Sequence, residues 1–555
     1  MKRLVLLLFA AFFIPYIGLK AIGKDDPVHL RISKQLKVPS TVDKGAWNLV
    51  SRIEAWKAAE TAIIICDMWD KHWCDDATTR VAEMASEMNK VIAIAREKGV
   101  KIVHAPSDCM DFYANYPGRK EALKYKDKTI AGLAKGNKLA SEENAPWPVD
   151  QSDEGCENAG CKPHKAWKKQ IDALTITDKD LISDSGEEIG AYFKKKGIKN
   201  VILMGVHTNM CVIGRTFGLR AMTRMGMNVV LMRDMTDLMY NSKMPPYVNH
   251  FAGLDLIVDY IETYVCPSIL SIDFTGKKQF RFKGDTRQRI AFVTAEGEYR
   301  ANQRLPEFAH ELSLKHNIHC DFALGIPIMN DAKKDADPKL KAEYAAYGMP
   351  IDNAGKITVS PTRHNIENLQ ILNDADLAVI FVRRRALEPE MMALIKDFVT
   401  KGRPVLALRT ASHAFDANRK VPRSEIDNKA STSEFLAQWP EFDMQVLGGN
   451  YQGHYGRLDA GTDVTIVPGM EGHPLLKGVE PKFNSPNWLY KNRPLRSGNI
   501  QVLMLGINPG VPDEPVAWIN NNKVVYTSLG HWDDWKIESF RNFMFNAVEY
   551  LMNKK

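Results

Sequence analysis

Residues 200–212 read NVILMGVHTNMCV, an apolar run that turns polar and ends next to a cysteine. The run 200–204 is predicted to be a buried strand, and a helix is predicted to begin near Cys211. A helical stretch at 187–196 precedes this strand, and the apolar run 228–232 (NVVLM) follows it. Strands that alternate with helices in this way are typical of a parallel sheet with helices on its faces.

The same alternation extends toward the N-terminus. Residues 61–66 (TAIIIC) form one short apolar run, and residues 101–104 (KIVH) form another. Between them, apolar residues recur at three- and four-residue spacing, which predicts an amphipathic helix over 78–98. These positions are Val81, Met84, Met88, Val91, Ile92 and Ala95. Gly99 then ends the helix as a C-cap glycine.

A second alternating region begins after a polar, basic stretch at about 267–289. Its predicted strands are 289–295, 376–383, 404–410, 516–519 and 524–528, and its predicted helices are 305–315, 388–400 and 538–552. The predicted fold class is therefore α/β with two doubly wound parallel-sheet domains. We place these domains at 45–270 and 289–555, with a linker at 271–288.

The composition is that of a folded chain. Of 555 residues, 45% are hydrophobic and 25% are charged, which excludes a disordered or collagen-like protein. The net charge of +7 is spread along the chain and is not gathered in one basic stripe. Nucleic acid is therefore not an expected partner.

The N-terminus has the order of charges and apolar residues seen in a secretory signal. Lys2 and Arg3 precede an apolar run at 4–19. This run is short for a hydrocarbon core of about 30 Å, and no clear cleavage site follows it. Residues 1–23 are interpreted as either a signal peptide or an uncleaved anchor. In both cases we expect an exported protein, periplasmic, in the cell envelope or secreted, that contacts a membrane only through this segment.

The eight cysteines are too few for a scaffold built on disulfides. Cys156 and Cys161 lie in the polar loop CENAGCKPH. Two interpretations of this pair stay open. The two cysteines either form a small disulfide in an oxidising compartment or hold a metal ion together with His164.

Two reactive residues are predicted to meet at one edge of the first sheet. Asp67 follows the strand 61–66 directly, and Cys211 opens a helix after the strand 200–204. Ligands gather at the carboxyl ends of parallel strands. The N–H groups of a helix start favour a thiolate, and a neighbouring carboxylate can accept the thiol proton. The pattern indicates acyl chemistry at Cys211, and the competing interpretation is a buried, unreactive cysteine.

The segment NVILMGVHTNMCV, with NVVLMRDMTD after it, resembles the cysteine-hydrolase superfamily of nicotinamidases, N-carbamoylsarcosine amidohydrolases and isochorismatases. The resemblance covers about 61–267 and implies an isochorismatase-like three-layer domain. It implies that Cys211 is the nucleophile and Asp67 its base. It also implies a cis peptide bond before His207, which lets the N–H groups of His207 and Cys211 form an oxyanion hole. The family has a lysine upstream of its cysteine, and Lys179 is the candidate here.

Some members of that superfamily bind a divalent metal beside the cysteine. By the same resemblance, Asp70, His72 and His104 are the candidate ligands, and the competing interpretation is a solvated aspartate with hydrogen-bonded histidines. No cofactor is expected to be required otherwise. Trp69 and Trp73 are candidates for an aromatic wall against a planar substrate, or else for core residues.

The second half carries histidines in glycine-rich or strand-end contexts: His413 after PVLALRTAS, His454 in GGNYQGHYG, His473 in EGHPLL and His531 in YTSLGHWDDW. The pattern over about 289–552 resembles the trehalose-utilisation (ThuA-like) family, whose fold is related to class I glutamine amidotransferases. The resemblance implies a carbohydrate-related domain whose cleft is lined by His413, His454 and His531. Residues 409–413 (RTASH) stand where an amidotransferase would place its cysteine, so glutaminase chemistry is not expected.

Together these patterns predict an exported cysteine hydrolase that acts on a C–N bond, amide or imide, of a small molecule and is fused to a ThuA-like domain. The alternative is a carbohydrate-active or sugar-binding protein whose first domain is an inactive scaffold. The expected partners are a small amide or a sugar-derived substrate, with a homo-oligomer implied by resemblance alone. Both folds host many functions, so residues at the site must decide between the hypotheses.

Overall fold

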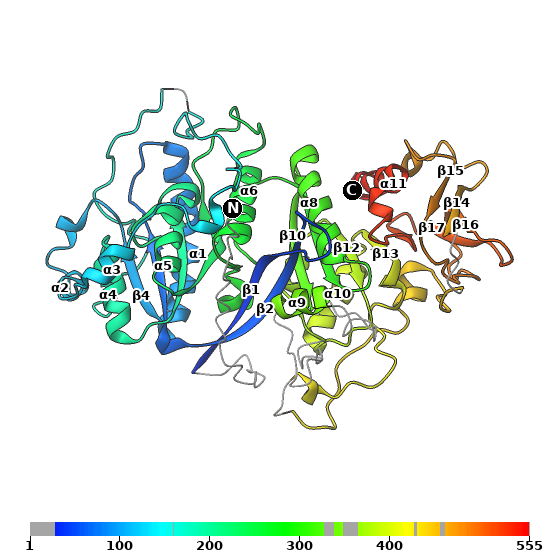
Figure 1. The fold of residues 1–555 in the computed structure, drawn as a ribbon, viewed down its shortest axis with the longest axis horizontal. Coiled ribbons are helices and arrows are strands. Elements are labelled where there is room, and N and C mark those ends of the chain that lie inside the picture. Colours follow the sequence, from blue (N-terminus) through cyan, green and yellow to red (C-terminus); the bar gives the residue numbers. More distant parts are fainter. Residues whose placement is uncertain are drawn as a thin grey trace, which may run out of the picture.

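The structure is a computed structural model that describes residues 28–158, 160–326, 338–347, 364–426, 430–455 and 461–553. Their strands form two sheets, one of eight strands and one of ten, with helices on the faces (Figure 1). The predicted fold class, α/β with two large parallel-rich sheets, is confirmed. The change from one sheet to the other falls between Ile269 and Arg289, the stretch that the sequence marks as polar and basic.

The first sheet has the order β2-β1-β8-β7-β6-β3-β4-β5. Its strands are β1 (His29–Pro39), β2 (Trp47–Lys57), β3 (Thr61–Cys66), β4 (Lys101–Ala105), β5 (Leu181–Ile182), β6 (Asn200–Val206), β7 (Asn228–Asp237) and β8 (Ser268–Ile269). Strands β3 to β8 pair in parallel, whereas β1 is antiparallel to both β2 and β8. Strands β3 and β6 are buried along their whole length, which explains their unbroken apolar sequences.

Helices cover both faces of the first sheet and complete three layers. They are α1 (Asp75–Glu97), α2 (Pro117–Ala122), α3 (Lys128–Leu133), α4 (Gly186–Lys196), α5 (Leu219–Arg224), α6 (His250–Tyr264) and α7 (Ile272–Thr275). Because neighbouring residues of a strand point to opposite faces, Ile63 and Ile65 of β3 pack in one core with α1. Ile64 packs in the other core with α4, α5 and α6.

The second sheet has the order β11-β10-β9-β12-β13-β18-β17-β16-β14-β15. Its strands are β9 (Arg289–Ala295), β10 (His319–Gly325), β11 (Ile366–Glu367), β12 (Leu377–Val382), β13 (Val405–Leu408), β14 (Thr462–Ile466), β15 (Lys482–Ser485), β16 (Ile500–Ile507), β17 (Glu514–Asn520) and β18 (Val524–Thr527). Strands β10, β9, β12, β13 and β18 are parallel, and antiparallel strands extend the sheet on both sides. Its helices are α8 (Ala301–His316), α9 (Pro338–Ala346), α10 (Pro389–Thr400) and α11 (Glu538–Met552).

The hairpin of β1 and β2 belongs to the first sheet but also packs on the second half of the chain (Figure 1). It joins the first sheet where Gln35 of β1 pairs with Ser268 of β8. Leu49 of β2 is buried in the same core as α8 and β10. Arg31 of β1 makes a two-pronged ion pair with Glu367 of β11, at 2.6 and 2.7 Å. The hairpin thus links the two sheets, and it begins before the predicted start of the first domain at residue 45.

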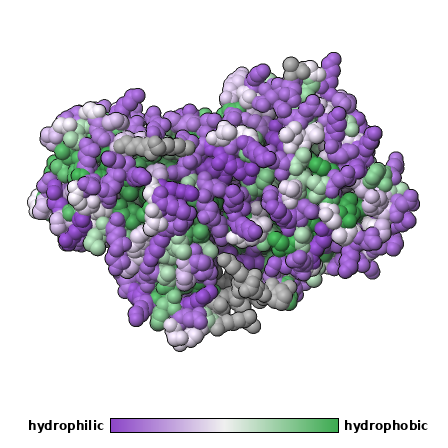
Figure 2. Space-filling model, turned by 180° about the vertical axis from the view of Figure 1, so that it is seen from behind, coloured by the Kyte–Doolittle hydropathy of each residue, from purple (hydrophilic) through white to green (hydrophobic). Residues whose placement is uncertain are grey.

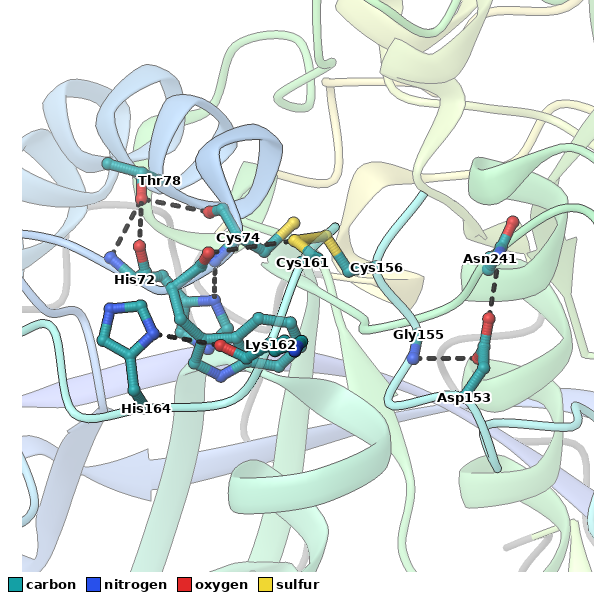
Figure 3. Close-up of a disulfide and its surroundings, with 11 residues drawn as sticks. His72, Cys74, Thr78, Asp153, Gly155, Cys156, Cys161, Lys162, His164 and Asn241 are labelled. Atoms are coloured by element: carbon teal, nitrogen blue, oxygen red, sulfur yellow. Dashed lines mark hydrogen bonds between the residues drawn. A yellow bond between two sulfur atoms is a disulfide. The ribbon is translucent and has the colours of Figure 1, made fainter. Parts of the chain in front are cut away.

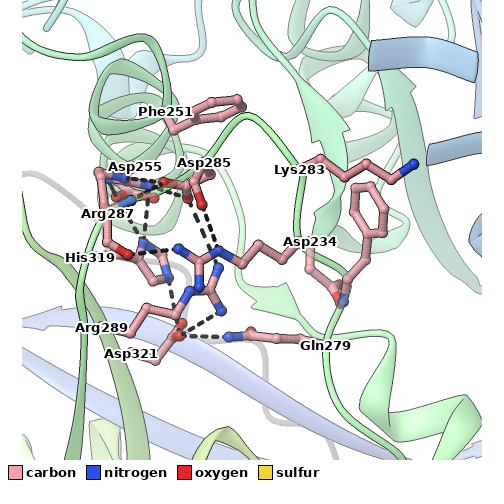
Figure 4. A network of polar contacts seen from close by, with 12 residues as sticks. Asp234, Phe251, Asp255, Gln279, Lys283, Asp285, Arg287, Arg289, His319 and Asp321 are labelled. Atoms are coloured by element: carbon pink, nitrogen blue, oxygen red, sulfur yellow. Dashed lines mark hydrogen bonds and ion pairs between the residues drawn. The ribbon is translucent and has the colours of Figure 1, made fainter. Parts of the chain in front are cut away.

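A cluster of charged side chains fills the junction between α6 and β10 (Figure 4). Asp255 of α6 accepts from Arg287 Nη1 at 2.6 Å and contacts His319 Nδ1 at 3.0 Å. His319 Nε2 lies 3.0 Å from Asp321 of β10, and Arg287 also binds Asp285 at 2.8 Å. Ionic contacts therefore complement the hydrophobic packing between the two halves.

The face turned away from the viewer in Figure 1 is dominated by hydrophilic residues, with hydrophobic ones in scattered groups (Figure 2). No helix among the described residues is both long and apolar enough to cross a membrane. The predicted signal or anchor at 1–23 lies outside the described residues, so export stays a prediction.

Candidate active site

The candidate active site lies where β3 and β6 end side by side. The two strands are parallel, with Cys66 opposite Gly205. A Cβ atom on Gly205 would lie 2.1 Å from the Cys66 carbonyl oxygen, so only glycine permits this close approach. Asp67 follows β3, and Cys211 lies in the helical turn Thr208–Val212 that follows β6. The structure therefore brings together the residues that the sequence predicts as base and nucleophile.

Asp67 is buried, and both of its carboxylate oxygens have partners. Oδ1 accepts from the backbone N–H of Ser107 at 2.7 Å, and Oδ2 accepts from Arg215 Nε at 3.0 Å. The Cys211 thiol lies near enough to this carboxylate for the two groups to influence each other's pKa. Burial raises the pKa of Asp67 above its ordinary value, and the contacts with Arg215 and Ser107 limit the rise. Asp67 is thus positioned to accept the thiol proton, with a cation at its other side.

Cys211 rests as a thiol in this environment. Burial raises its pKa, and the negative charge of Asp67 raises it further, whereas Arg215 opposes the rise. The backbone N–H of His207 also opposes the rise, and the Val206–His207 peptide bond is cis, as the family resemblance implies. The cis bond directly precedes His207, one of the two residues of the predicted oxyanion hole.

Lys179 is not in this cluster, and the prediction that it is the third member is corrected. Its side chain is exposed, and its backbone carbonyl accepts a hydrogen bond from Lys101 Nζ. The cation beside Asp67 is Arg215, whose backbone N–H donates to the Cys211 carbonyl at 2.9 Å. The positive charge thus comes from the turn that carries the cysteine and not from an upstream strand.

Asp70, His72 and His104 do not converge, so the predicted divalent-metal site is also corrected. Each has another partner: Asp70 accepts from the Lys168 N–H, His72 Nδ1 from the Cys74 N–H, and His104 contacts Gln170 and Asp180. Among the described residues, none of the three belongs to a group of three or more metal-ligating side chains. These donors do not fit a common metal ion, and no step of the chemistry is assigned to one.

Aromatic rings form a wall next to the nucleophile turn. Trp69 and Trp167 stack with ring centroids 3.9 Å apart, and both indole N–H groups donate to the Ser107 carbonyl at 3.1 Å. His72 lies 4.9 Å from the His207 ring and 6.0 Å from Trp69. Burial lowers the pKa of His72 to about 4, so it is neutral at pH 7. Trp69 is therefore both buried and part of the wall, as the two sequence interpretations allow.

Three side chains of this site are not predicted from the sequence: those of Arg215, Trp167 and His207. Arg215 lies four residues after Cys211, a spacing that places two residues on one helix face and is a usable signal. Trp167 comes from the long insertion before β5, and nothing in the sequence pairs it with Trp69. His207 is buried, and its Nε2 has no hydrogen-bond partner among the described residues. A buried polar atom without a partner is available to a ligand.

The histidines of the second half lie in one region but do not form a single cluster. His413 is buried, stacks on Tyr451 at 4.6 Å and contacts Ser412 Oγ at 3.1 Å. His531 lies 5.7 Å from Tyr299 on another loop. His454 is exposed and packs against Trp488. The predicted cleft of His413, His454 and His531 is thus a row of aromatic rings with histidines along it.

Arg409 occupies the centre of that row, at the turn after β13. Its φ of +42° places it in the left-handed region, and its side chain is fully buried. The guanidinium stacks between Tyr299 and Tyr490, at 4.2 and 4.6 Å, and Nη2 donates to Asn487 Oδ1 at 2.6 Å. By the resemblance to class I glutamine amidotransferases, Arg409 thus stands where such an enzyme would have its cysteine.

Cys156 and Cys161 are joined by a disulfide (Figure 3). His164 is exposed, and its Nδ1 lies 3.0 Å from the Lys162 carbonyl oxygen. Of the two interpretations left open by the sequence, the structure contains the disulfide. The cysteine that does lie beside this pair is Cys74, and these three sulfurs form the one possible metal-binding group found among the described residues.

Comparison with known proteins matches residues 61–239 to the isochorismatase domain. No curated protein matches the chain. Similar solved structures include a ThuA-like protein from Parabacteroides merdae (15% identity, 49% of this chain and 91% of that chain, TM-score 0.28). Others are an isochorismatase family protein from Burkholderia thailandensis (11%, 39% and 93%, TM-score 0.23) and the pyrazinamidase of Pyrococcus horikoshii in complex with zinc (15%, 38% and 99%, TM-score 0.23). The matched domain includes both Asp67 and Cys211.

Proposed function

We propose, from the isochorismatase domain at residues 61–239, that this protein is a cysteine hydrolase acting on the C–N bond of a small amide or imide. In this proposal Cys211 is the nucleophile and Asp67 the general base. Arg215 holds the position next to Asp67 that the family gives to a lysine. The observation that carries the proposal is the buried Asp67 carboxylate, which accepts a hydrogen bond from Arg215 and whose charge acts on the Cys211 thiol.

The reaction proceeds in two stages. Asp67 accepts the thiol proton as the Cys211 sulfur attacks the carbonyl carbon, and the oxyanion accepts hydrogen bonds from the N–H groups of His207 and Cys211. The C–N bond breaks, the nitrogen leaves with the proton held by Asp67, and an acyl thioester remains. A water molecule, deprotonated by Asp67, then attacks the thioester and releases the acid and the thiol.

The surroundings of Cys211 favour a planar substrate. Trp69, Trp167 and the neutral ring of His72 offer flat apolar faces next to the nucleophile turn. The unpartnered His207 Nε2 is a polar atom that a substrate can bind. A small heteroaromatic or cyclic amide combines both features.

The proposal includes export by residues 1–23 and a binding role for the second half. The rings of Tyr299 and Tyr451 are partly exposed and that of Trp488 is exposed, so a sugar can stack on them, which supports a sugar-derived ligand there. Arg409 fills the turn after β13 and is no nucleophile, so the chemistry is assigned to the first half.

The test is alkylation of the purified full chain by iodoacetamide, mapped by mass spectrometry, together with hydrolysis of a panel of small amides. We expect Cys211 to react faster than the buried Cys74 and Cys109. Asp67→Asn should slow alkylation of Cys211 at least tenfold, and Cys211→Ala should remove hydrolysis. Cys109→Ser, a change at another buried cysteine, serves as the control and should leave both readouts unchanged. Equal reactivity of Cys211 and Cys109 in the wild type would rule out an activated nucleophile.

A further inference from the structure

Three sulfur atoms meet beside the nucleophile turn, and the proposed hydrolysis uses none of them. The free thiol of Cys74 and the disulfide of Cys156 and Cys161 lie with all three Sγ atoms within 4.8 Å of one another (Figure 3). The disulfide belongs to the insertion before β5, whereas Cys74 is the residue that caps the start of α1. Cys161 Sγ also lies 3.8 Å from the carbonyl oxygen of Trp73, the residue before Cys74.

The position of Cys74 suits a sulfur nucleophile that has one electrophile within reach. Burial raises the pKa of the Cys74 thiol, and the backbone N–H groups of Ala77 and Asp76 at the start of α1 oppose that rise. Ala77, Met210 and Met239 pack around the three sulfurs. This apolar packing shields the thiol from outside reagents and leaves the disulfide next to it.

We propose that Cys74, Cys156 and Cys161 form a thiol–disulfide exchange centre. Cys74 loses its proton, and its sulfur attacks one sulfur of the Cys156–Cys161 pair. A new S–S bond forms to Cys74 while the old S–S bond breaks, and the departing sulfur takes up the proton. The protein is neither oxidised nor reduced, because one disulfide replaces another and one thiol remains.

The insertion that carries the disulfide also contacts the nucleophile turn. Gly155 packs so closely on the Met239 backbone that a Cβ atom there would lie 2.4 Å from the Met239 carbonyl carbon. Asn209, inside the nucleophile turn, donates to Gln151 Oε1 and to the Met239 carbonyl oxygen, both at 2.7 Å. A disulfide from Cys74 to either partner ties this insertion directly to α1. The exchange itself does not depend on the hydrolase proposal, since it involves neither Cys211 nor Asp67.

The experiment uses two variants of the full chain, Cys156→Ser and Cys161→Ser, treated with oxidised glutathione and digested without reductant for mass spectrometry. We expect Cys74 to form a disulfide with Cys161 in the first variant or with Cys156 in the second. The matched control is Cys109→Ser, which removes a buried thiol elsewhere and should keep the Cys156–Cys161 disulfide. Cys74 recovered as a free thiol in both folded variants would overturn the proposal.

A second measurement on the wild type keeps the test decisive if either variant does not fold. The native protein is incubated with a small amount of reduced glutathione at pH 8, quenched with N-ethylmaleimide and mapped in the same way. We expect peptides linked through Cys74 next to those linked through Cys156 and Cys161. If Cys156–Cys161 remains the one linkage at every time point, the exchange does not occur.

Discussion

The charge that accompanies Asp67 comes from the cysteine's own turn. Arg215 follows Cys211 by four residues and contacts the carboxylate through Nε at 3.0 Å. A guanidinium stays protonated at every pH that the protein meets, so it keeps the buried carboxylate ionised without itself exchanging a proton. Arg215 thereby favours the ionised form of Asp67, which is the form that can accept the thiol proton.

Arg215→Met is expected to shift the acid side of the pH profile of Cys211 alkylation upward by a pH unit or more. Without the cation, burial is left as the main influence on Asp67 and raises its pKa further, so the carboxyl loses its ability to accept the thiol proton at a higher pH than in the wild type. The measurement is the alkylation rate between pH 4.5 and 9. Arg215→Lys keeps the charge and should restore most of the rate at pH 6. An unchanged profile in Arg215→Met would show that Arg215 is not needed beside Asp67.

Among the site residues, the sequence predicts those that lie at the ends of strands. It does not predict those whose position depends on the conformation of a turn. Asp67 and Cys211 were predictable because each follows a buried apolar strand and parallel strands end at one edge. Lys179 was chosen by its distance along the chain, but the backbone at that point turns its side chain to solvent. Whether Arg215 or another basic residue reaches Asp67 depends on the exact turn after β6, which no apolar pattern encodes.

Among the elements, the β1–β2 hairpin has an unusual role because it pairs with one sheet and packs on the other. Leu49 is 3% exposed and shares a core with Leu305 and Phe308 of α8. Removal of the Leu49 side chain is therefore expected to weaken the packing of α8, which lies about 250 residues further along the chain.

We expect Leu49→Ala to destabilise the protein by about 2–4 kcal/mol and to speed hydrogen exchange in α8 and β10. The readouts are urea denaturation and hydrogen exchange followed by mass spectrometry. Val42→Ala, at an exposed position between β1 and β2, is the control and should have little effect. Faster exchange limited to β1 and β2, with α8 unchanged, would contradict the bridging role.

The elements that the sequence predicts best are those with a strong period or continuous burial. Strand 61–66 agrees with β3 residue by residue, and the helix predicted at 538–552 agrees with α11. The β1–β2 hairpin was missed because charged residues interrupt its apolar ones and because its burial depends on contacts far along the chain. The short strands β14 to β16 were missed for a similar reason, since they are only partly buried.

In the whole molecule, the junction of the two halves contains a partly buried histidine between two carboxylates. Burial alone would lower the pKa of His319, but the charges of Asp321 and Asp255 outweigh burial and raise it to about 9. The protonated form is thus favoured in the folded state. Since the folded pKa lies above the unfolded value of about 6.5, this stabilisation is complete below pH 6.5 and is lost as the pH rises through 9.

We therefore expect the wild type to lose up to about 3 kcal/mol of stability between pH 6.5 and 9.5, which is the pKa shift of His319 converted to free energy. His319→Gln should be less stable than the wild type at pH 6 and should vary less across this range. Urea denaturation at several pH values measures both. The control is His310→Gln, which changes an exposed histidine of α8 and should keep the wild-type pH dependence. Parallel curves for the wild type and His319→Gln would exclude this histidine as the cause.

The position of the β1–β2 hairpin between the two sheets also has a consequence for folding during synthesis. Leu49 leaves the ribosome roughly 250 residues before α8 is complete, and at about 5–20 residues per second this is a wait of roughly ten to fifty seconds. During that time the apolar side chain of Leu49 lacks its native partners in α8 and β10. The nascent chain thus exposes this apolar surface until its second half has been translated.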